Sequence, residues 1–93
     1  MAEVRAGVDS LDRELVALLA ERFRFMDAAA RIKPERGQVR DEARKRQVID
    51  NAMAEAKARG LSPETIGALW DALVEASIAH ELRQWEKMRA AAG

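Results

Sequence analysis

Several residue types that carry chemistry or crosslinks are scarce in this chain of 93 residues. Cysteine is absent, which excludes disulfides, thiolate nucleophiles and cysteine-based metal sites. The single histidine, His80, excludes zinc motifs built on a histidine pair and catalytic arrangements that need a spare histidine. Neither sign of charge is in excess, because 16 Lys and Arg balance 16 Asp and Glu. That balance argues against nucleic acid or an anionic membrane as a partner.

Long hydrophobic runs are missing too, since no apolar stretch approaches the roughly 18 residues that span a bilayer. The first residues lack the basic-then-apolar pattern of a secretion signal. A cytoplasmic protein without a membrane partner is therefore expected. A chain of this length is also expected to form one domain, over residues 1–93.

Strand-forming residues are few, with no tyrosine and only 2 phenylalanines, so we predict an all-α fold with three helices. Pro34 should end the first helix, Asp41 should cap the second, and Gly60 should follow the second helix's end. Ser62 and Pro63 together are typical of a helix start. The expected helices cover residues 4 or 9 to 32, 41 to 60, and 63 to 89.

The first helix is long for so small a chain. About 25 residues make a helix of about 38 Å, whereas a compact domain of this size is only about 32 Å across. A helix longer than its domain cannot be covered by its own chain, so we predict a homodimer in which the first helix pairs with its copy. Its apolar positions recur at spacings of three, four and seven, namely Val8, Leu11, Leu15, Leu18, Leu19, Met26 and Ala29.

Charged residues interrupt the apolar stripes and carry the functional signal. Arg22 and Lys33 are eleven residues apart, which is about 20° from three full turns, so they share a face of the first helix. Side chains that converge from these two positions leave room for a small anion. The alternative is that both extend to water along the surface.

The second and third helices supply further polar residues. Arg44 lies on the apolar side of the second helix, although it could instead be a surface residue paired with Asp41. Ser77 and Glu81, spaced i,i+4, break the apolar stripe of the third helix. An inward serine can bond to a backbone carbonyl one turn back, whereas an inward carboxylate needs a compensating partner.

Arg5 cannot reach the same pocket within one chain. It lies 17 residues before Arg22, about 100° from that face and about 25 Å away along the axis. In an antiparallel dimer it could reach the pocket of the partner. Such a pocket, lined by cations from several helices, suits a compact dianion, and its chemistry would need only positioning and electrostatic stabilisation.

The chemistry-bearing and apolar positions form an ordered set, which consists of Arg5, Asp9, Asp12, Leu15, Leu18, Leu19, Ala20, Arg22, Lys33, Val39, Arg40, Asp41, Arg44, Ser77 and Glu81. This set resembles the all-helical, type II chorismate mutase family over almost the whole chain. The resemblance implies an intertwined, three-helix homodimer that converts chorismate to prephenate, in aromatic amino acid biosynthesis, with no cofactor and no metal.

The resemblance also implies a role for each site residue. Arg22, Arg44 and the partner subunit's Arg5 would hold the two substrate carboxylates. Lys33 would point at the ether oxygen, where negative charge grows as the C–O bond breaks, and Glu81 would face the same oxygen.

Two further contacts and two departures from the family pattern follow from the resemblance. Ser77 would contact a carboxylate or the region of the ring hydroxyl, and Asp41 would help at that hydroxyl. Many members carry glutamate immediately after the second-helix arginine, where this chain has Lys45. Glu81 stands where bacterial mutases usually have glutamine, although fungal members have glutamate there.

Two alternatives remain open from the sequence. Isochorismate-pyruvate lyases share the fold and the basic pocket, and residues 27–33 and 77–85 resemble that branch, whereas residues 39–44 look more like the mutases. A non-catalytic dimeric helical interaction module would instead place Arg22, Lys33 and Arg44 in solvent, beside nearby acids. Trp70 and Trp85 are expected in the core, and His80 is expected as a partly exposed helix residue.

Overall fold

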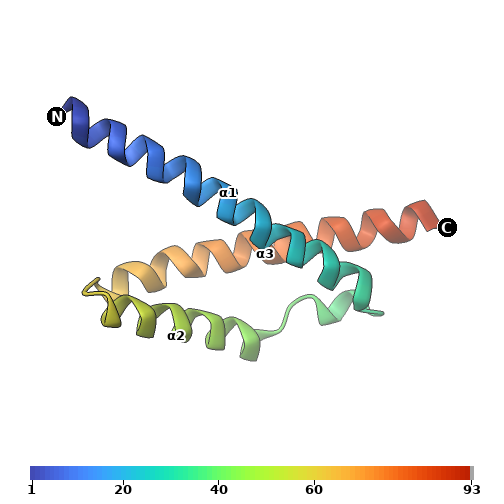
Figure 1. The fold of residues 1–93 in the computed structure, drawn as a ribbon. Helices are drawn as coiled ribbons and strands as arrows, with labels where there is room; N and C mark the ends of the chain where they lie inside the picture. The colour runs from blue at the N-terminus through green and yellow to red at the C-terminus, as the bar shows by residue number, and fades with distance from the viewer. Residues whose placement is uncertain (93) are drawn as a thin grey trace.

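The protein is described by a computed structural model over residues 1–92, and within those residues it contains helices and no strand. The predicted all-α fold of three helices is therefore confirmed (Figure 1). None of the helices in the described part is long and apolar enough to cross a membrane. The elements are α1 (Ala2–Ile32), the 3₁₀ turn η1 (Arg36–Gln38), α2 (Glu42–Ala58) and α3 (Pro63–Ala92).

The helix ends follow the local signals closely. α1 begins at Ala2, earlier than the sequence indicated, and ends one residue before the Lys33–Pro34 pair. Asp41 caps α2, because its carboxylate accepts a hydrogen bond from the backbone N–H of Arg44 at 3.0 Å. Gly60 has a φ of 76° just beyond α2, a backbone conformation that glycine adopts without steric cost.

α3 also begins where the sequence placed it. The Ser62 hydroxyl accepts the backbone N–H of Thr65 at 3.2 Å, which satisfies one of the free amides of the first turn. The helix runs to Ala92, beyond the expected end near Arg89. The linker after α1 holds the unexpected turn η1, which Glu35 and Gln38 stabilise by reciprocal side-chain-to-backbone bonds.

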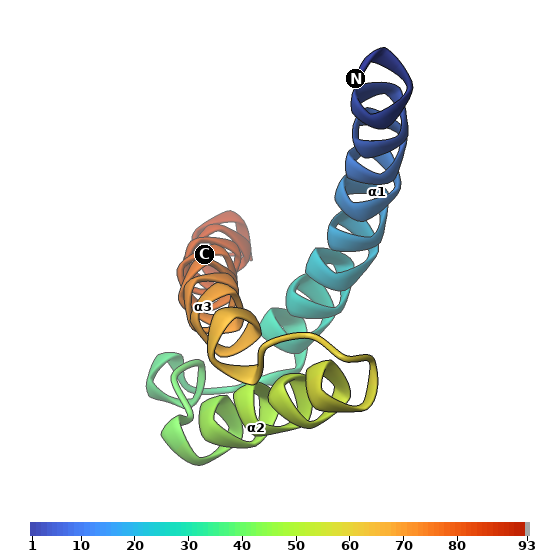
Figure 2. The ribbon, with the colours of Figure 1, turned by 90° about the vertical axis from the view of Figure 1, so that its left-hand side faces the viewer.

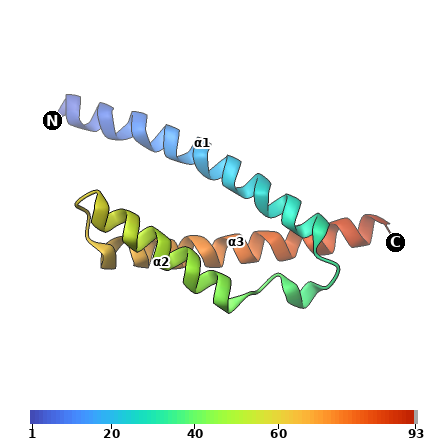
Figure 3. The same cartoon turned by 60° about the horizontal axis from the view of Figure 1, so that its bottom comes forward.

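α3 forms the middle of the molecule and packs against both α1 and α2 (Figure 3). The N-terminal half of α1 extends well away from α2 and α3, as Figure 2 shows. The Cα radius of gyration is 16.1 Å and the extents are 54 × 28 × 15 Å. A compact chain of this length would have a radius of gyration of about 12 Å, so the single chain is elongated.

The apolar core is small and lies where the linker and α2 meet α3. It contains the buried residues Val39, Val74 and Ile78, with partly buried Trp85 packed against them. Trp70 is half-buried. In contrast, Val8, Leu11, Leu15 and Leu18 on α1 are 50–60% exposed. The core of one chain therefore leaves the N-terminal part of the predicted apolar stripe of α1 uncovered, as far as Leu18.

Candidate active site

Two cations of α1 converge on one face of α3. The Arg22 guanidinium donates to Ser77 Oγ at 2.5 Å, and Lys33 Nζ lies 2.8 Å from Glu81 Oε2. Ser77 and Glu81 are one helical turn apart, and each is only 4% exposed. Arg22 and Lys33 thus point toward α3, which is the opposite of what a solvent-facing interaction module requires.

Ser77 makes both kinds of contact that its position allows. Its hydroxyl donates to the carbonyl oxygen of Leu73, one turn back, at 2.7 Å, and it accepts the bond from Arg22. The backbone bond fixes the direction of the hydroxyl, so its lone pair faces α1. The Arg22 guanidinium is consequently held in one orientation.

Arg44 brings a second guanidinium near Arg22. Burial lowers the pKa of Arg22, and the positive charge of Arg44 lowers it further. Arg44 itself is exposed and donates to Gln47 Oε1 at 2.6 Å, so its guanidinium does not pair with Asp41. Two cations that destabilise one another are stabilised by an anion placed between them.

A cavity of about 350 Å³ joins these residues. That volume suits a small organic ligand. Its lining combines apolar and polar side chains and consists of Arg22, Met26, Ala29, Lys33, Val39, Asp41, Arg44, Lys45, Val48, Val74, Ser77, Ile78 and Glu81. Every predicted site residue except Arg5 therefore borders one cavity.

Arg5 lies near the exposed N-terminal end of α1. The helix continues without a break from Ala2 to Ile32. Arg5 is thus about 25 Å along the axis from Arg22, and it is not brought to the cavity of its own chain.

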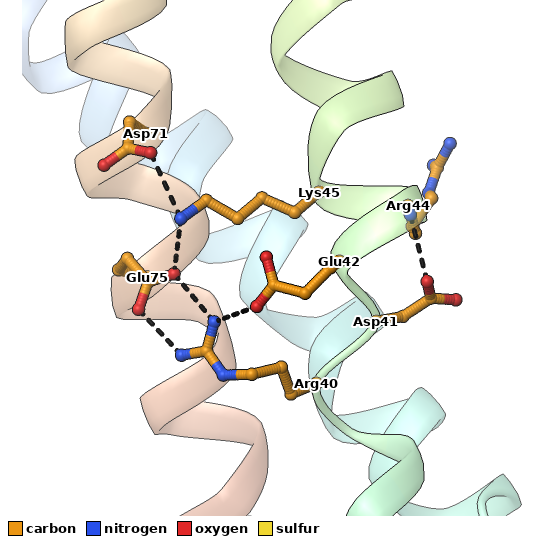
Figure 4. Close-up of polar contacts among 7 residues, drawn as sticks. All are labelled: Arg40, Asp41, Glu42, Arg44, Lys45, Asp71 and Glu75. Atoms are coloured by element: carbon orange, nitrogen blue, oxygen red, sulfur yellow. Dashed lines mark hydrogen bonds and ion pairs between the residues drawn. The ribbon is translucent and has the colours of Figure 1, made fainter.

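Lys45, the departure from the family pattern, is tied to α3. Its ammonium lies 2.8 Å from Glu75 and 3.1 Å from Asp71 (Figure 4). Glu75 also accepts two bonds from Arg40, at 2.8 and 3.1 Å. The bonds from Arg40, followed by those from Lys45, lower the pKa of Glu75 to about 2. The same contacts, Glu75 first and Asp71 next, raise the pKa of Lys45.

Figure 4 shows that Lys45 and Arg44 leave α2 in different directions. Lys45 reaches α3, whereas the Arg44 side chain lies away from the ion cluster of Arg40, Lys45 and Glu75. The ion cluster thus anchors the first turn of α2 to α3, and Arg44 is left on the side of the cavity.

Some contacts near the site could not be read from the sequence. His80 Nε2 lies 2.6 Å from Asp27 Oδ1, and Phe23 meets the His80 ring edge-on at a centroid distance of 4.9 Å. Trp85 and Arg89 of α3 donate to backbone carbonyls at the end of α1. The only local signal of the contacts made by Trp85 and Arg89 is Pro34, because it lacks the backbone N–H that would otherwise bond to a carbonyl of α1.

Three helices around a small cavity rich in cations define a helical protein suited to binding a compact dianion. Residues 4–82 match the family described as chorismate mutase type II, and the chain belongs to that family. The resemblance seen in the sequence is thereby confirmed. Membership supports an enzyme of the kind that metabolises chorismate.

A curated relative falls in the sister branch. Isochorismate pyruvate lyase of Pseudomonas aeruginosa is 24% identical over 92 residues, which cover 99% of this chain and 91% of the relative. The family match includes Ser77 and Glu81 and ends before Trp85 and Arg89.

Proposed function

We propose that this protein is a chorismate mutase, which rearranges chorismate to prephenate in the tyrosine and phenylalanine branch of aromatic amino acid biosynthesis. It acts as a single cytoplasmic domain, without a cofactor. The observation that carries the proposal is the convergence of Arg22 and Lys33 on Ser77 and Glu81 inside one cavity, with Arg44 beside them. This arrangement matches a substrate with two carboxylates and an ether oxygen between them.

The reaction asks little of the protein beyond positioning. One C–O bond breaks as one C–C bond forms within the same molecule, so no nucleophile or proton donor is consumed. Arg22 and Arg44 hold carboxylates through their guanidinium forks. The Lys33 ammonium stabilises the charge that develops on the ether oxygen, in a cavity that limits competition from water.

A second chain completes the site. The exposed apolar stripe on α1 and the elongated shape of the single chain support an intertwined homodimer. When two α1 helices run antiparallel, the partner subunit's Arg5 lies at the cavity that contains Arg22. The site then has three guanidinium groups for two carboxylates.

The second candidate is an isochorismate-pyruvate lyase, which forms salicylate and pyruvate. It is favoured by the relative from Pseudomonas aeruginosa that carries this name. That reaction would also follow a pericyclic route and use the same cations for the same two carboxylates. The pocket charges therefore serve either activity.

Product analysis separates the candidates. Purified protein is incubated with chorismate and, separately, with isochorismate, and a preparation of the Lys33→Ala variant measures contaminating activity. We expect prephenate from chorismate. Salicylate and pyruvate from isochorismate, without prephenate, would assign the protein to the lyases. No product from either substrate would favour the non-catalytic helical module.

A further inference from the structure

The end of α1 has an unmet hydrogen-bonding need. In a continuing helix the carbonyl oxygen of Ala30 would accept the N–H of residue 34, but that residue is Pro34, which has none. Ala30 is 0% exposed, so water does not replace the missing donor. A buried carbonyl without a partner is costly, and the fold must supply a donor from elsewhere.

The donor comes from the last turns of α3. Arg89 Nη1 donates to the carbonyl oxygen of Ala30 at 2.7 Å, and its Nη2 donates to the carbonyl oxygen of Lys33 at 2.6 Å. Trp85 Nε1 donates to the same Lys33 oxygen at 2.9 Å. The guanidinium also lies 4.5 Å above the centre of the Trp85 ring, which stabilises its charge and its orientation. We call Trp85 and Arg89 the clasp.

The clasp and the cavity meet at one residue. Lys33 follows the last residue of α1 in an extended conformation, with φ −70° and ψ 120°. Its carbonyl is held by the clasp, while its ammonium lies 2.8 Å from Glu81. Glu81, Trp85 and Arg89 are spaced four residues apart, so one side of α3 fixes both ends of Lys33. A residue just outside a helix would otherwise have a mobile backbone.

We propose that Trp85 and Arg89 are positioning residues that act through Lys33. The proposal rests on the proposed function, in which Lys33 stabilises the ether oxygen. Both residues lie beyond the segment 4–82 that matches the family. The last turns of α3 therefore do more than extend the helix, because they set the position of the cation on which the reaction depends.

Kinetics test whether the clasp acts through Lys33. Arg89→Ala should lower kcat by about tenfold and change KM by less than about twofold, since a misplaced cation weakens transition-state stabilisation most. Arg89→Lys keeps the charge without the two-pronged fork and should recover part of the loss. The double variant Lys33→Ala/Arg89→Ala should be no slower than Lys33→Ala alone. If the losses of kcat from the two single substitutions multiply in the double variant, the two residues act independently and the proposal is wrong.

Two further variants separate positioning from general damage. Trp85→Phe removes the N–H donor and keeps a smaller aromatic ring against the core, so it should lower kcat by about threefold in a folded protein. Lys87→Ala removes an exposed cation two residues before Arg89 and should leave kcat unchanged. If Lys87→Ala lowers kcat as much as Arg89→Ala does, the loss comes from the removed charge or from a weaker helix rather than from the clasp.

Amide hydrogen exchange measured by NMR gives a readout that needs no substrate. The Lys33 N–H donates to the Ala29 carbonyl at 3.0 Å, and its exchange reports opening of the last turn of α1. Arg89→Ala and Trp85→Phe should speed that exchange, and Lys87→Ala should not. Unchanged exchange in the first two variants would reject the clasp. An inactive wild-type protein would reject the proposed function, while the exchange data would still decide whether the clasp holds Lys33.

Discussion

The two halves of α1 have opposite surfaces. All residues from 2 to 18 are exposed, including apolar Val4, Leu11 and Leu15 at 55–59%. The second half packs on α3, with Ala30 buried and the charged Arg22 turned inward. Within one helix, apolar side chains of the first half face solvent and one arginine of the second half faces the interior, which reverses the usual pattern.

This reversal indicates that the first half of α1 lacks a helix to pack against, whereas the second half lacks an anionic ligand. Val4, Val8, Leu11, Leu15 and Leu18 recur at alternating spacings of four and three, the pattern of a helix that pairs with another helix. Arg22 of the second half instead faces a cavity that it shares with Arg44, where a bound anion would stabilise both cations. In the proposed dimer, Arg5 would link the two needs, because the half that pairs also delivers a cation to the other chain's cavity.

The largest effect is expected from a charge placed on the apolar face of the first half of α1, which pairs with its copy in the proposed dimer. We expect Leu11→Glu to weaken the dimer by at least about 100-fold, since burying a carboxylate between helices costs more than about 3 kcal/mol. Folded structure and activity should be lost together at micromolar concentration. Sedimentation velocity and circular dichroism across a dilution series measure both.

Arg13→Glu is the matched control for that substitution. Arg13 is also exposed on the first half of α1 but lies roughly opposite Leu11 on the helix, about 160° away. The Arg13→Glu substitution should therefore leave the dimer intact. A wild-type protein that sediments as a folded 10.4 kDa monomer would contradict the predicted dimer outright.

Mixing two inactive variants tests whether the halves of different chains cooperate. Arg5→Ala and Arg22→Ala homodimers should each lose activity. After subunit exchange, each heterodimer would have one cavity with both arginines and one with neither. Random exchange of equal amounts should then restore about a quarter of the wild-type activity. Proven exchange without recovery would exclude shared sites.

The local architecture could be predicted because its signals are short-range. Pro34 and Gly60 act on the backbone of their own turns, and Asp41 caps the helix that follows it. The shared face of Arg22 and Lys33 follows from helical periodicity alone. For these features the sequence contains the whole cause.

Contacts between helices could not be predicted in the same way. The pairs of Trp85 and Arg89 with Lys33 join residues more than 50 positions apart, and they depend on how α3 crosses the end of α1. The ion pairs of Lys45 likewise depend on the spacing of α2 and α3. Even the hydrogen-bond partner of the Arg44 side chain could not be predicted, because the guanidinium donates to Gln47 rather than to Asp41.

Two cations that border the cavity, Lys33 just after α1 and Arg44 on α2, should respond differently to replacement by alanine. Lys33→Ala should lose mainly kcat, by about 100-fold or more, because one transition-state charge partner contributes about 3 kcal/mol. Arg44→Ala should also raise KM, since carboxylate binding exists in the ground state and in the transition state. Steady-state kinetics of both variants measure the split, and near-normal turnover in Lys33→Ala would refute its role.

Glu81 sharpens the contrast between inward charge and outward apolar surface, because it is the buried anion among the cations. Its carboxyl group lies 2.8 Å from the Lys33 ammonium and is expected to face the ether oxygen beside it. Glutamine at this position keeps a hydrogen-bond donor for that oxygen, whereas alanine has none. We therefore expect Glu81→Ala to lower kcat/KM well below the value for Glu81→Gln, as steady-state kinetics of both variants would measure. Equal values of kcat/KM for the two variants would remove Glu81 from the ether oxygen.

The smallest expected effect lies in the ion cluster, where Arg40, Lys45 and Glu75 pair with one another away from the catalytic groups. Bonds from Arg40 and Lys45 lower the pKa of Glu75 to about 2 from an ordinary value of 4.5. A carboxylate with a depressed folded-state pKa contributes stability above its unfolded pKa, and that contribution is lost as pH falls from about 4.5 through 2. Glu75→Gln removes the contribution, so the variant should melt slightly below wild type at pH 7.

The gap in melting temperature between wild type and Glu75→Gln should narrow as pH falls through that window, at one fixed protein concentration. Most of the contribution is screened, because the Glu75 side chain is 41% exposed, so a shift of only a few degrees is expected. Asp50→Asn, at an exposed carboxylate on α2, is the control and should keep a constant gap. A gap for Glu75→Gln that also stays constant from pH 7 to pH 2 would mean that the cluster holds α2 by packing rather than by charge.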